Sequence, residues 1–553
     1  MKEKVEFILR DTIHTLIKKG ALPDAGDIDI SVSIPQNKEF GDFATNIALV
    51  LASKARKPPR DVAGLIIEPL SKHKGLFETI EIAGPGFINF RVHPLMWISV
   101  LQGIHELKGD FGKSNIGGGK KVQIEFVSAN PTGPLHVGHG RGAAVGDTLV
   151  RILRATGFDA QAEYYINDVG NQMNMLGSSV SARYHKLCGV DVQFPQDGYK
   201  GTYIGNLAQQ LKDIHGEGLL NQPEEERIRI CRNFAEKIIS EGIKNDLELF
   251  NVHFDNWFSE SSLYRQAKVD KTLEFLKSEN LIYESEEAIW FKSTQFGDEK
   301  DRVLKKQDGS LTYFAPDIAY HKDKLDRGFE KIIDIWGADH HGYVPRMQAA
   351  IEALGAPRES FHALLIQLVS LERSGKPVYM STRAGEFVTL QEIINEVGKD
   401  AARYFFLMRR CDSHLIFDLE LAKKKSEENP VFYIQYAHAR ICSILNNARA
   451  QNIVPDVAKA DLGLLSSNDN LELIKVLASF PDVLNSSAQN LEPHRIAFYL
   501  LDLATIFHKF YNKNRVISDK RDLTMARLVL IDAVRQVICN AFSLMGISAP
   551  ESM

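Results

Sequence analysis

The chain has 553 residues, of which 44% are hydrophobic and 25% are charged, and its formal net charge is −5. A chain of this length is too long for a single hydrophobic core, so we expect about three or four domains. Its composition is typical of globular proteins and argues against long disordered segments. The net charge of the chain is mildly negative and gives no sign of nucleic-acid binding. Any RNA contact must therefore use local basic patches.

The N-terminal segment MKEKVEFILRDTIHTLIKKG is predicted to be an amphipathic helix, because no uninterrupted apolar core follows its basic residues as in a secretion signal. No run of eighteen apolar residues occurs, so no membrane span is expected. The five cysteines are scattered without a Cys-x-x-Cys pair, which indicates neither a disulfide framework nor a metal site. A cytoplasmic protein is expected.

Residues 1–112 are predicted to form a small α+β domain. The segment IDISVSIP is strand-like, and GDFATNIALVLASKARKPP has apolar residues at helical spacing. The segment ETIEIAGPGFINFRV alternates around a Gly-Pro-Gly break, as a hairpin would. Basic residues near the end of the helix form either a solvated helix end or a patch for an RNA backbone: Lys54, Arg56, Lys57 and Arg60.

Residues 118–388 are predicted to form an α/β domain. The strand VQIEFVS, the helix GAAVGDTLVRILRATG and the strand QAEYYIND have the lengths of a βαβ unit, and hence indicate a parallel sheet. Further strands are expected in KIIDIWGADHH and HALLIQLVSL, with the helix-like PRMQAAIEALG between them. A largely helical insertion at about residues 175–295 splits this sheet, and residues 389–553 are expected to be mainly helical.

The turn after the first strand of this sheet contains His136-Val137-Gly138-His139. Ligands of open parallel sheets bind at the carboxyl ends of the strands, and a helix N-terminus there favours phosphate. The two imidazoles lie three residues apart on one face of the first helical turn. By spacing alone they are either catalytic or ordinary turn residues.

Two motifs indicate a family. The run ANPTGPLHVGH resembles the HIGH signature of class I aminoacyl-tRNA synthetases, in the form used by arginyl-tRNA synthetases. The second signature, usually KMSKS, is similar to Tyr379-Met380-Ser381-Thr382-Arg383, although both lysines are missing. Lys376 and Arg383 are therefore the candidate cations for the triphosphate.

The resemblance to arginyl-tRNA synthetases extends along the chain. It includes FGDFATNIA in the N-terminal domain, NDVGNQ after the second strand, and FDNWFSES, TYFAPDIAYH and WGADHHGYV around the expected site. DAARYFF resembles the DALR helix that names the anticodon-binding domain, and the chain ends in methionine as these enzymes do. The resemblance implies a Rossmann-like catalytic domain between an N-terminal domain for the tRNA elbow and an all-α anticodon-binding domain.

The resemblance also implies an activity. ATP, with Mg²⁺, activates L-arginine to arginyl-adenylate, and the arginine is then transferred to the 3′ end of tRNA(Arg) with release of AMP and diphosphate. The implied protein is a monomer that does not bind membranes and has no metal site of its own.

Site residues follow from the resemblance position by position. The implied catalytic residues are His136, His139 and Ser381. The implied ATP-binding residues are Gly138, Gly337, Asp339, His341, Lys376, Met380 and Arg383. The implied arginine-binding residues are Glu125, Ser128, Asn130, Glu260, Tyr313 and Asp317. The implied tRNA-binding residues are Asn37, Phe40, Lys54, Arg56, Lys57, Tyr436, His438, Arg440 and Met553.

Several residues have a plainer interpretation. Glu125 lies inside a strand of a buried sheet and needs a partner, unless that strand is an exposed edge. Asp317 could cap its helix, and Tyr436 could be a core residue. A different class I synthetase, a nucleotidyltransferase and a non-catalytic RNA-binding paralogue are the competing functions. The intact HVGH and the expected pocket carboxylates favour the enzyme over the paralogue.

Overall fold

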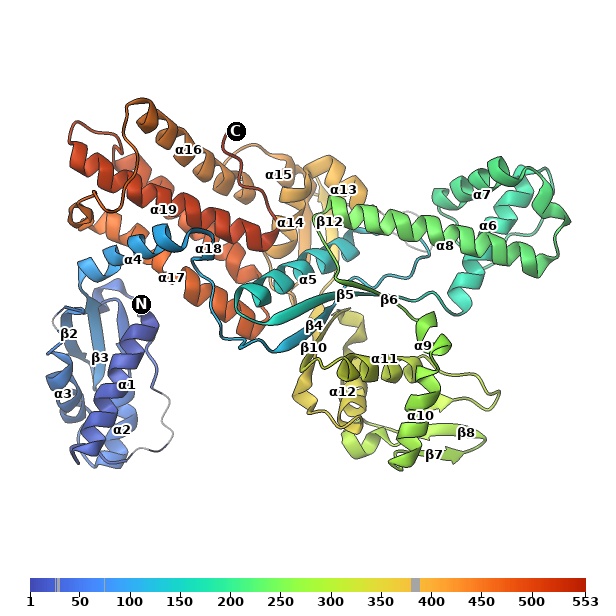
Figure 1. Cartoon of the computed structure of the whole chain (residues 1–553), viewed down its shortest axis with the longest axis horizontal. Coiled ribbons are helices and arrows are strands. Elements are labelled where there is room, and N and C mark those ends of the chain that lie inside the picture. The colour runs from blue at the N-terminus through green and yellow to red at the C-terminus, as the bar shows by residue number, and fades with distance from the viewer. Residues whose placement is uncertain (25, 27–29, 74, 379–387) are drawn as a thin grey trace.

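The computed structural model describes residues 1–24, 26, 30–73, 75–378 and 388–553. The N-terminal domain, blue in Figure 1, packs three helices against a small antiparallel sheet in the order β1-β3-β2. Its elements are α1 (Lys2–Lys18), β1 (Phe43–Thr45), α2 (Ile47–Ala55), α3 (Pro59–Leu70), β2 (Phe77–Ala83) and β3 (Phe87–Val92). The expected hairpin is therefore present. In the described part of IDISVSIP, only Ser33 forms a β-bridge, to Ala44.

The central domain is built on a parallel sheet with the strand order β11-β10-β4-β5-β6. Its strands are β4 (Lys121–Glu125), β5 (Asp159–Ile166), β6 (Asn256–Ser259), β10 (Lys331–Gly337) and β11 (Phe361–Ile366). The crossover helices beside them include α5 (Val137–Ala155), α11 (Phe314–Asp326) and α12 (Val344–Ala353). The predicted βαβ unit and parallel sheet are confirmed, and β4 lies in the middle of the sheet.

A helical insertion projects from the sheet to the right in Figure 1. It consists of α6 (Asn171–Leu187), α7 (Thr202–His215) and α8 (Glu224–Leu249). The expectation of helix up to about residue 295 missed strands, because β6 returns to the central sheet and a separate antiparallel sheet follows. That later region contains α9 (Ser261–Arg265), α10 (Lys268–Ser278), β7 (Ile282–Ser285), β8 (Ala288–Phe291) and β9 (Arg302–Lys305).

A further three-stranded sheet, in the order β13-β12-β14, joins the central domain to the helices that follow. Its strands are β12 (Val369–Arg373), β13 (Lys376–Val378) and β14 (Leu415–Asp418). The segment HALLIQLVSL, expected as one strand, is therefore two strands that belong to different sheets. β12 pairs in parallel with β14, which the helical pattern after residue 389 did not indicate.

The C-terminal domain is a helical bundle, as predicted (Figure 1). Its helices are α13 (Leu390–Val397), α14 (Lys399–Leu407), α15 (Leu419–Lys423), α16 (Pro430–Ala450), α17 (Asn468–Asn490), α18 (His494–Lys513) and α19 (Arg521–Met545), and α4 (Pro94–Leu107) packs against it from the N-terminal side. Among the described residues, only α19 is long and apolar enough to cross a membrane, but 61% of its most apolar window is buried. It is the central core helix of the bundle.

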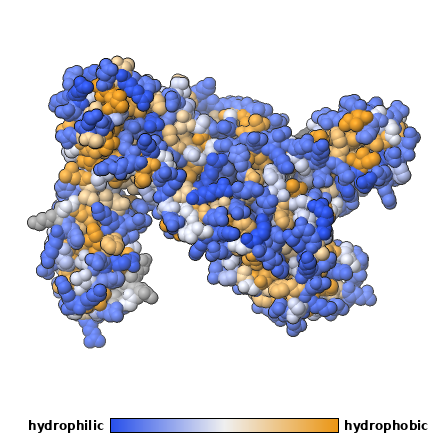
Figure 2. Space-filling model, in the orientation of Figure 1, coloured by the Kyte–Doolittle hydropathy of each residue, from blue (hydrophilic) through white to orange (hydrophobic). Residues whose placement is uncertain are grey.

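The surface is mostly hydrophilic, with hydrophobic side chains exposed singly or in small groups on the face that Figure 2 shows. The interior is a core that runs from the N-terminal domain through the sheet into the bundle, together with a second core beneath α11 and α12. The central sheet has one core on each face, since Ile333 of β10 belongs to the first core and Ile332 to the second.

Candidate active site

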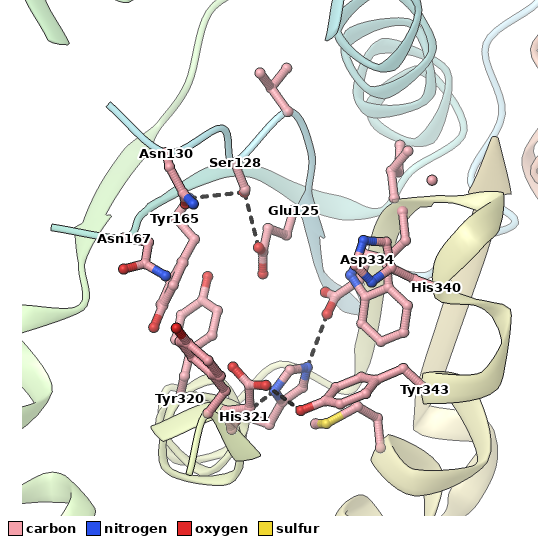
Figure 3. Close-up of a pocket in the computed structure, with 17 residues that line it drawn as sticks. Glu125, Ser128, Asn130, Tyr165, Asn167, Tyr320, His321, Asp334, His340 and Tyr343 are labelled. Carbon is pink, nitrogen blue, oxygen red and sulfur yellow. Dashed lines mark hydrogen bonds and ion pairs between the residues drawn. The ribbon is translucent and has the colours of Figure 1, made fainter. Parts of the chain in front are cut away.

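A cavity of about 420 Å³ lies at the carboxyl ends of β4, β5 and β10, against α11. This is the edge at which parallel sheets bind their ligands. Figure 3 shows Glu125 and Asp334 pointing into the cavity, with Tyr320, His321 and Tyr343 on the opposite side. The full lining is Glu125, Val127, Ser128, Asn130, Tyr165, Asn167, Tyr313, Asp317, Tyr320, His321, Asp334, Ile335, Trp336, Gly337, His340, Tyr343 and Met347.

The turn after β4 is strained. Val127 and Ser128 have φ angles of 67° and 40°, a conformation that is unusual for any residue with a side chain and especially for a β-branched one. Ser128 Oγ donates to Glu125 Oε1 at 2.9 Å and accepts from the backbone N–H of Tyr165 at 3.1 Å. The strain thus holds the Ser128 hydroxyl and the Glu125 carboxylate together at the cavity wall.

Glu125 is 9% exposed in a central strand, which excludes its interpretation as an edge residue. Its partner is Lys324 of α11, which is completely buried and lies 2.7 Å from Glu125 Oε2 and 2.8 Å from Asp334 Oδ1. Burial raises the pKa of Glu125, and Lys324 opposes that rise. Burial would likewise raise the pKa of Asp334, but Lys324 and His321 bring it below its ordinary value. One lysine therefore pairs with two carboxylates, and the net charge of the cavity wall remains negative.

Tyr313 and Asp317 lie at the start of α11 and both line the cavity, on one face as predicted from their spacing. The Tyr313 side chain is exposed, whereas Asp317 is partly buried. Asp317 Oδ2 accepts a short hydrogen bond from the hydroxyl of Tyr343. Within the described residues no backbone amide donates to this carboxylate, so it does not cap the helix. Burial raises the pKa of Asp317, and the bond from Tyr343 opposes that rise.

Glu260 lies behind the cavity wall and does not line the cavity. It is 5% exposed, and burial raises the pKa of its carboxyl to about 7. The Tyr165 hydroxyl is close enough to influence that pKa, although it forms no well-directed hydrogen bond within the described chain. When its side-chain amide is oriented so that the nitrogen faces acceptors, Asn167 donates a hydrogen bond to Glu260 Oε2 at 3.1 Å. Asn130, the last predicted residue of this group, donates to Gln172 at 2.5 Å.

His136 and His139 form the N-terminus of α5. His136 Nδ1 accepts from the Gly138 N–H at 3.1 Å, and His139 Nδ1 accepts from the His136 N–H at 3.2 Å. The two rings are stacked with centroids 3.7 Å apart. Burial, with the neighbouring His136, lowers the pKa of His139 to about 3, and burial lowers the pKa of His136 as well. Because both Nδ1 atoms are acceptors, each neutral ring carries its hydrogen on Nε2.

The chain returns to this turn immediately after the second signature. Val137 N–H donates to Val388 O at 3.2 Å, and Leu390 N–H donates to Leu135 O at 2.8 Å. Met380, Ser381 and Arg383 lie outside the described residues. Lys376 is exposed at the start of β13. The residues that follow the second signature are thus joined to the first signature by backbone hydrogen bonds at Leu135 and Val137.

Of the predicted nucleotide residues, Gly337 ends β10 and lines the cavity. Gly138 is exposed at the start of α5. Asp339 and His341 lie in the next turn, are exposed and do not line the cavity, whereas His340 between them does. A Cβ at position 337 would meet Asp339 Oδ1 at 2.4 Å, so the exposed Asp339 side chain would have to move to admit any other residue there.

Sequence reasoning missed several lining residues: Tyr165, Asn167, Tyr320, His321, Asp334, Trp336, His340 and Tyr343. Asp334 could have been found from the sequence, because a carboxylate within the apolar strand KIIDIWG needs a partner just as Glu125 does. The aromatic residues could not, because nothing in their spacing distinguishes them from core residues.

The predicted tRNA residues of the N-terminal domain are at the surface. Asn37 caps a short helical turn by accepting from the Glu39 N–H, and Phe40 is 53% exposed. Lys54, Arg56 and Lys57 are all exposed at the end of α2. This group is accessible to a partner.

The predicted tRNA residues of the helical domain differ among themselves. Arg440 lies over the rings of Tyr436 and Tyr511, at 4.4 and 4.7 Å from their centroids, and donates to the Tyr436 hydroxyl at 2.6 Å. Met553 is 55% exposed. His438 is 2% exposed, and its ring nitrogens contact Pro550 O at 2.8 Å and Cys539 Sγ at 3.1 Å. Its position therefore corrects the expectation of an RNA contact, because this ring joins the C-terminal tail to α16.

Comparisons with known proteins cover the whole chain. Residues 4–92 match the arginyl-tRNA synthetase N-terminal domain, residues 105–416 the catalytic domain of class I tRNA synthetases (R), and residues 434–553 the DALR anticodon-binding domain. The chain is 49% identical to the arginine–tRNA ligase of Syntrophotalea carbinolica over 100% of both chains, and 47% identical to that of Bacillus pumilus over 100% of this chain and 99% of the relative. The solved structure of Thermus thermophilus arginyl-tRNA synthetase shares the fold, with a TM-score of 0.76 at 21% identity over 100% of both chains.

Proposed function

The chain belongs to the arginyl-tRNA synthetase family as a class I arginine–tRNA ligase, and from that membership we propose which of its residues carry each step. The enzyme activates arginine with ATP and transfers it to the 3′ end of tRNA(Arg), with release of AMP and diphosphate. The observation that carries the proposal is the acidic cavity at the carboxyl edge of the sheet, together with the two stacked histidines at the start of α5, the helix that follows β4.

The arginine side chain enters this cavity. A guanidinium group is always charged and presents a planar fork of donors, which calls for carboxylate partners. Asp317 is the carboxylate that lines the cavity without an ion pair to another described side chain, and Tyr313 forms the rim above it. Glu260, with a pKa of about 7, is partly protonated at neutral pH. A guanidinium nearby favours its ionised form.

The α-amino and carboxylate groups of arginine lie toward β4. Glu125 accepts a hydrogen bond from the Ser128 hydroxyl on Oε1, and its carboxylate faces the α-ammonium group of arginine. Asn130 lies at the same end of the cavity. Burial raises the pKa of Glu125, and Lys324, 2.7 Å from the carboxylate, opposes that rise and favours the ionised form.

The activation step needs positioning rather than a base, because the arginine carboxylate is already ionised at neutral pH. A carboxylate oxygen forms a bond to the α-phosphorus while the bond to the diphosphate breaks. His136 and His139 present Nε2 hydrogens that stabilise the charge on the phosphate oxygens. Ser381, Lys376 and Arg383 hold the remaining phosphates, with Met380, Asp339 and His341 completing the nucleotide site.

Magnesium enters with the triphosphate as part of the substrate. Within the described residues, no group of three His, Cys, Asp or Glu side chains is placed to hold a metal ion. We propose that its ligands are mainly phosphate oxygens and water, as is usual for magnesium bound with a nucleotide.

The outer domains bind tRNA. We assign residues 1–112 to the tRNA elbow, residues 118–388 to catalysis and residues 389–553 to the anticodon. Asn37, Phe40, Lys54, Arg56 and Lys57 contact the elbow, and Tyr436, Arg440 and Met553 lie near the anticodon. We propose that the enzyme acts in the cytoplasm as a monomer, as membership of the family implies.

Asp317→Asn tests the pocket, since it keeps the shape and removes the charge. Leaving a guanidinium without its buried partner costs roughly 2–5 kcal/mol, so the arginine KM should rise about 30-fold to several-thousand-fold, with little change in Tm. The preference of the enzyme for arginine over citrulline, whose ureido group is neutral, should decrease. Asp326→Asn, on the same helix but exposed, is the matched control. An arginine KM within about threefold of wild type would show that the pocket is wrongly assigned.

A further inference from the structure

Tyr343 contacts the proposed guanidinium partner from a different element. It ends the short helical turn Ala338–Tyr343 and immediately precedes α12, whereas Asp317 belongs to α11. Its hydroxyl donates to Asp317 Oδ2, and both residues line the cavity. In Figure 3 the ring of Tyr343 lies beside His321 at the lower side of the cavity. One oxygen of the Asp317 carboxylate is therefore already hydrogen-bonded within the protein before arginine binds.

The Tyr343 ring is held on several sides. Phe314 and Trp336 pack edge-to-face against it, with centroids 5.9 and 5.8 Å away at interplanar angles of 81° and 67°. The guanidinium of Arg346 lies 4.8 Å from its centroid. Edge-to-face pairs and cation–π contacts favour one ring orientation over others. The hydroxyl is thus aimed at Asp317 by packing and not by the hydrogen bond alone.

Asp317 depends on this hydroxyl because no ion pair supports it within the described chain. Burial and the neighbouring Asp334 raise the pKa of Asp317, and the hydrogen bond from Tyr343 is the largest effect in the opposite direction. Burial and Asp317 itself raise the pKa of Tyr343 well above its ordinary value, so the phenol stays protonated and remains a donor.

We propose that Tyr343 is a positioning residue for arginine, which fixes the plane of the Asp317 carboxylate so that its other oxygen receives the guanidinium. This inference rests on the proposed role of Asp317. The fixed plane matters because a guanidinium bonds in a planar fork, whereas an ammonium group has no such requirement. Tyr343 therefore contributes to the choice of arginine without bonding it.

Tyr343→Phe tests the inference, because it removes one oxygen atom and keeps the packed ring. A hydrogen bond to an ionised group changes an equilibrium about tenfold or more, so the arginine KM at neutral pH should rise about tenfold while the ATP KM stays the same. The pKa of Asp317 should rise when the donor is lost. Because only the carboxylate form binds a cation, the acid limb of kcat/KM for arginine should move to higher pH. Tyr404→Phe, which removes a buried hydroxyl bonded to Ala497 O in the helical domain, is the matched control.

A second arm separates this inference from the function on which it rests. In an Asp317→Asn background, the additional Tyr343→Phe change should alter the arginine KM less than twofold, because the two residues act as one unit. An equal loss in both backgrounds, or an unshifted acid limb, would overturn the role of Tyr343. If Asp317→Asn alone leaves arginine binding unchanged, the pocket assignment itself fails.

Discussion

His139 uses its two ring nitrogens for different purposes. Nδ1 accepts the backbone N–H of His136 and so caps α5, while Nε2 remains the hydrogen-bearing atom. Since the pKa of His139 is lowered to about 3, the ring is neutral throughout the physiological range. The same residue can therefore stabilise the helix terminus and donate to a phosphate oxygen.

These two purposes can be separated by substitution. His139→Asn places an amide oxygen near the position of Nδ1 and keeps the cap, whereas His139→Gln places an amide nitrogen near the position of Nε2 and keeps the donor. We expect the Asn variant to lose about 10²–10³ in ATP–diphosphate exchange with near-normal Tm, and the Gln variant to lose less. Equal exchange in both variants would contradict the donor role.

Replacing both His136 and His139 with Ala should abolish adenylate formation and leave tRNA binding nearly intact. The separation between chemistry and RNA binding is expected because both rings belong to the catalytic edge of the sheet. Exchange within about threefold of wild type in this double variant would refute the role of the pair.

At the scale of the element, α16 presents a cation and its aromatic partners together. Tyr436 is neither fully buried nor fully exposed, its ring supports the Arg440 guanidinium at 4.4 Å, and His508 lies beside it. This arrangement suits stacking against a nucleotide base, and it also suits a packing role at the edge of the bundle. The two roles predict different effects of removing the ring.

Tyr436→Ala distinguishes them. Stacking of a base is worth roughly 1–3 kcal/mol, so the tRNA KM should rise at least severalfold if the ring contacts RNA. Tyr436→Phe is the matched control, because it keeps the ring and removes only the hydroxyl that accepts from Arg440. A variant with lowered Tm but normal tRNA affinity would identify Tyr436 as a core residue.

At the scale of the whole molecule, Arg403 joins three parts of the chain. This side chain of α14 is completely buried, pairs with Asp147 of α5, and donates to Met545 O at 2.6 Å and to Phe250 O at 3.0 Å. Gly546 is required next to it, because a Cβ there would meet the guanidinium at 2.6 Å. The helical domain is thereby fastened to the helix that begins with His136.

Arg403→Met should destabilise the enzyme by up to roughly 3–5 kcal/mol, because it leaves the buried Asp147 carboxylate with Arg151 as its remaining cation and removes the donor to Met545 O and Phe250 O. Thermal unfolding should show this loss, and the double change with Asp147→Asn should cost less than the sum of the two single changes. Arg409→Met, an exposed neighbour in the same segment, is the control and should stay within about 0.5 kcal/mol of wild type. Additive losses would show that the pair is not coupled.

Much of the architecture follows from local pattern. The βαβ spacing around α5 predicted the parallel sheet, and the helical periodicity after residue 389 predicted the bundle, because both signals repeat over many residues. Short strands escaped prediction. β6 has four residues, and β14 has four within a helical region, so each owes its state to its partner strand rather than to its own propensity.

The sequence by itself determined the family, the edge of the sheet at which the cavity lies, and which motif residues we propose for the site, such as His136, His139 and Asp317. Tertiary structure alone decided their partners. Lys324 lies 199 residues from Glu125, and Tyr343 lies 26 residues from Asp317 on another element. The physical reason is that burial creates the need for a partner, whereas the fold decides which distant side chain is near enough to meet it.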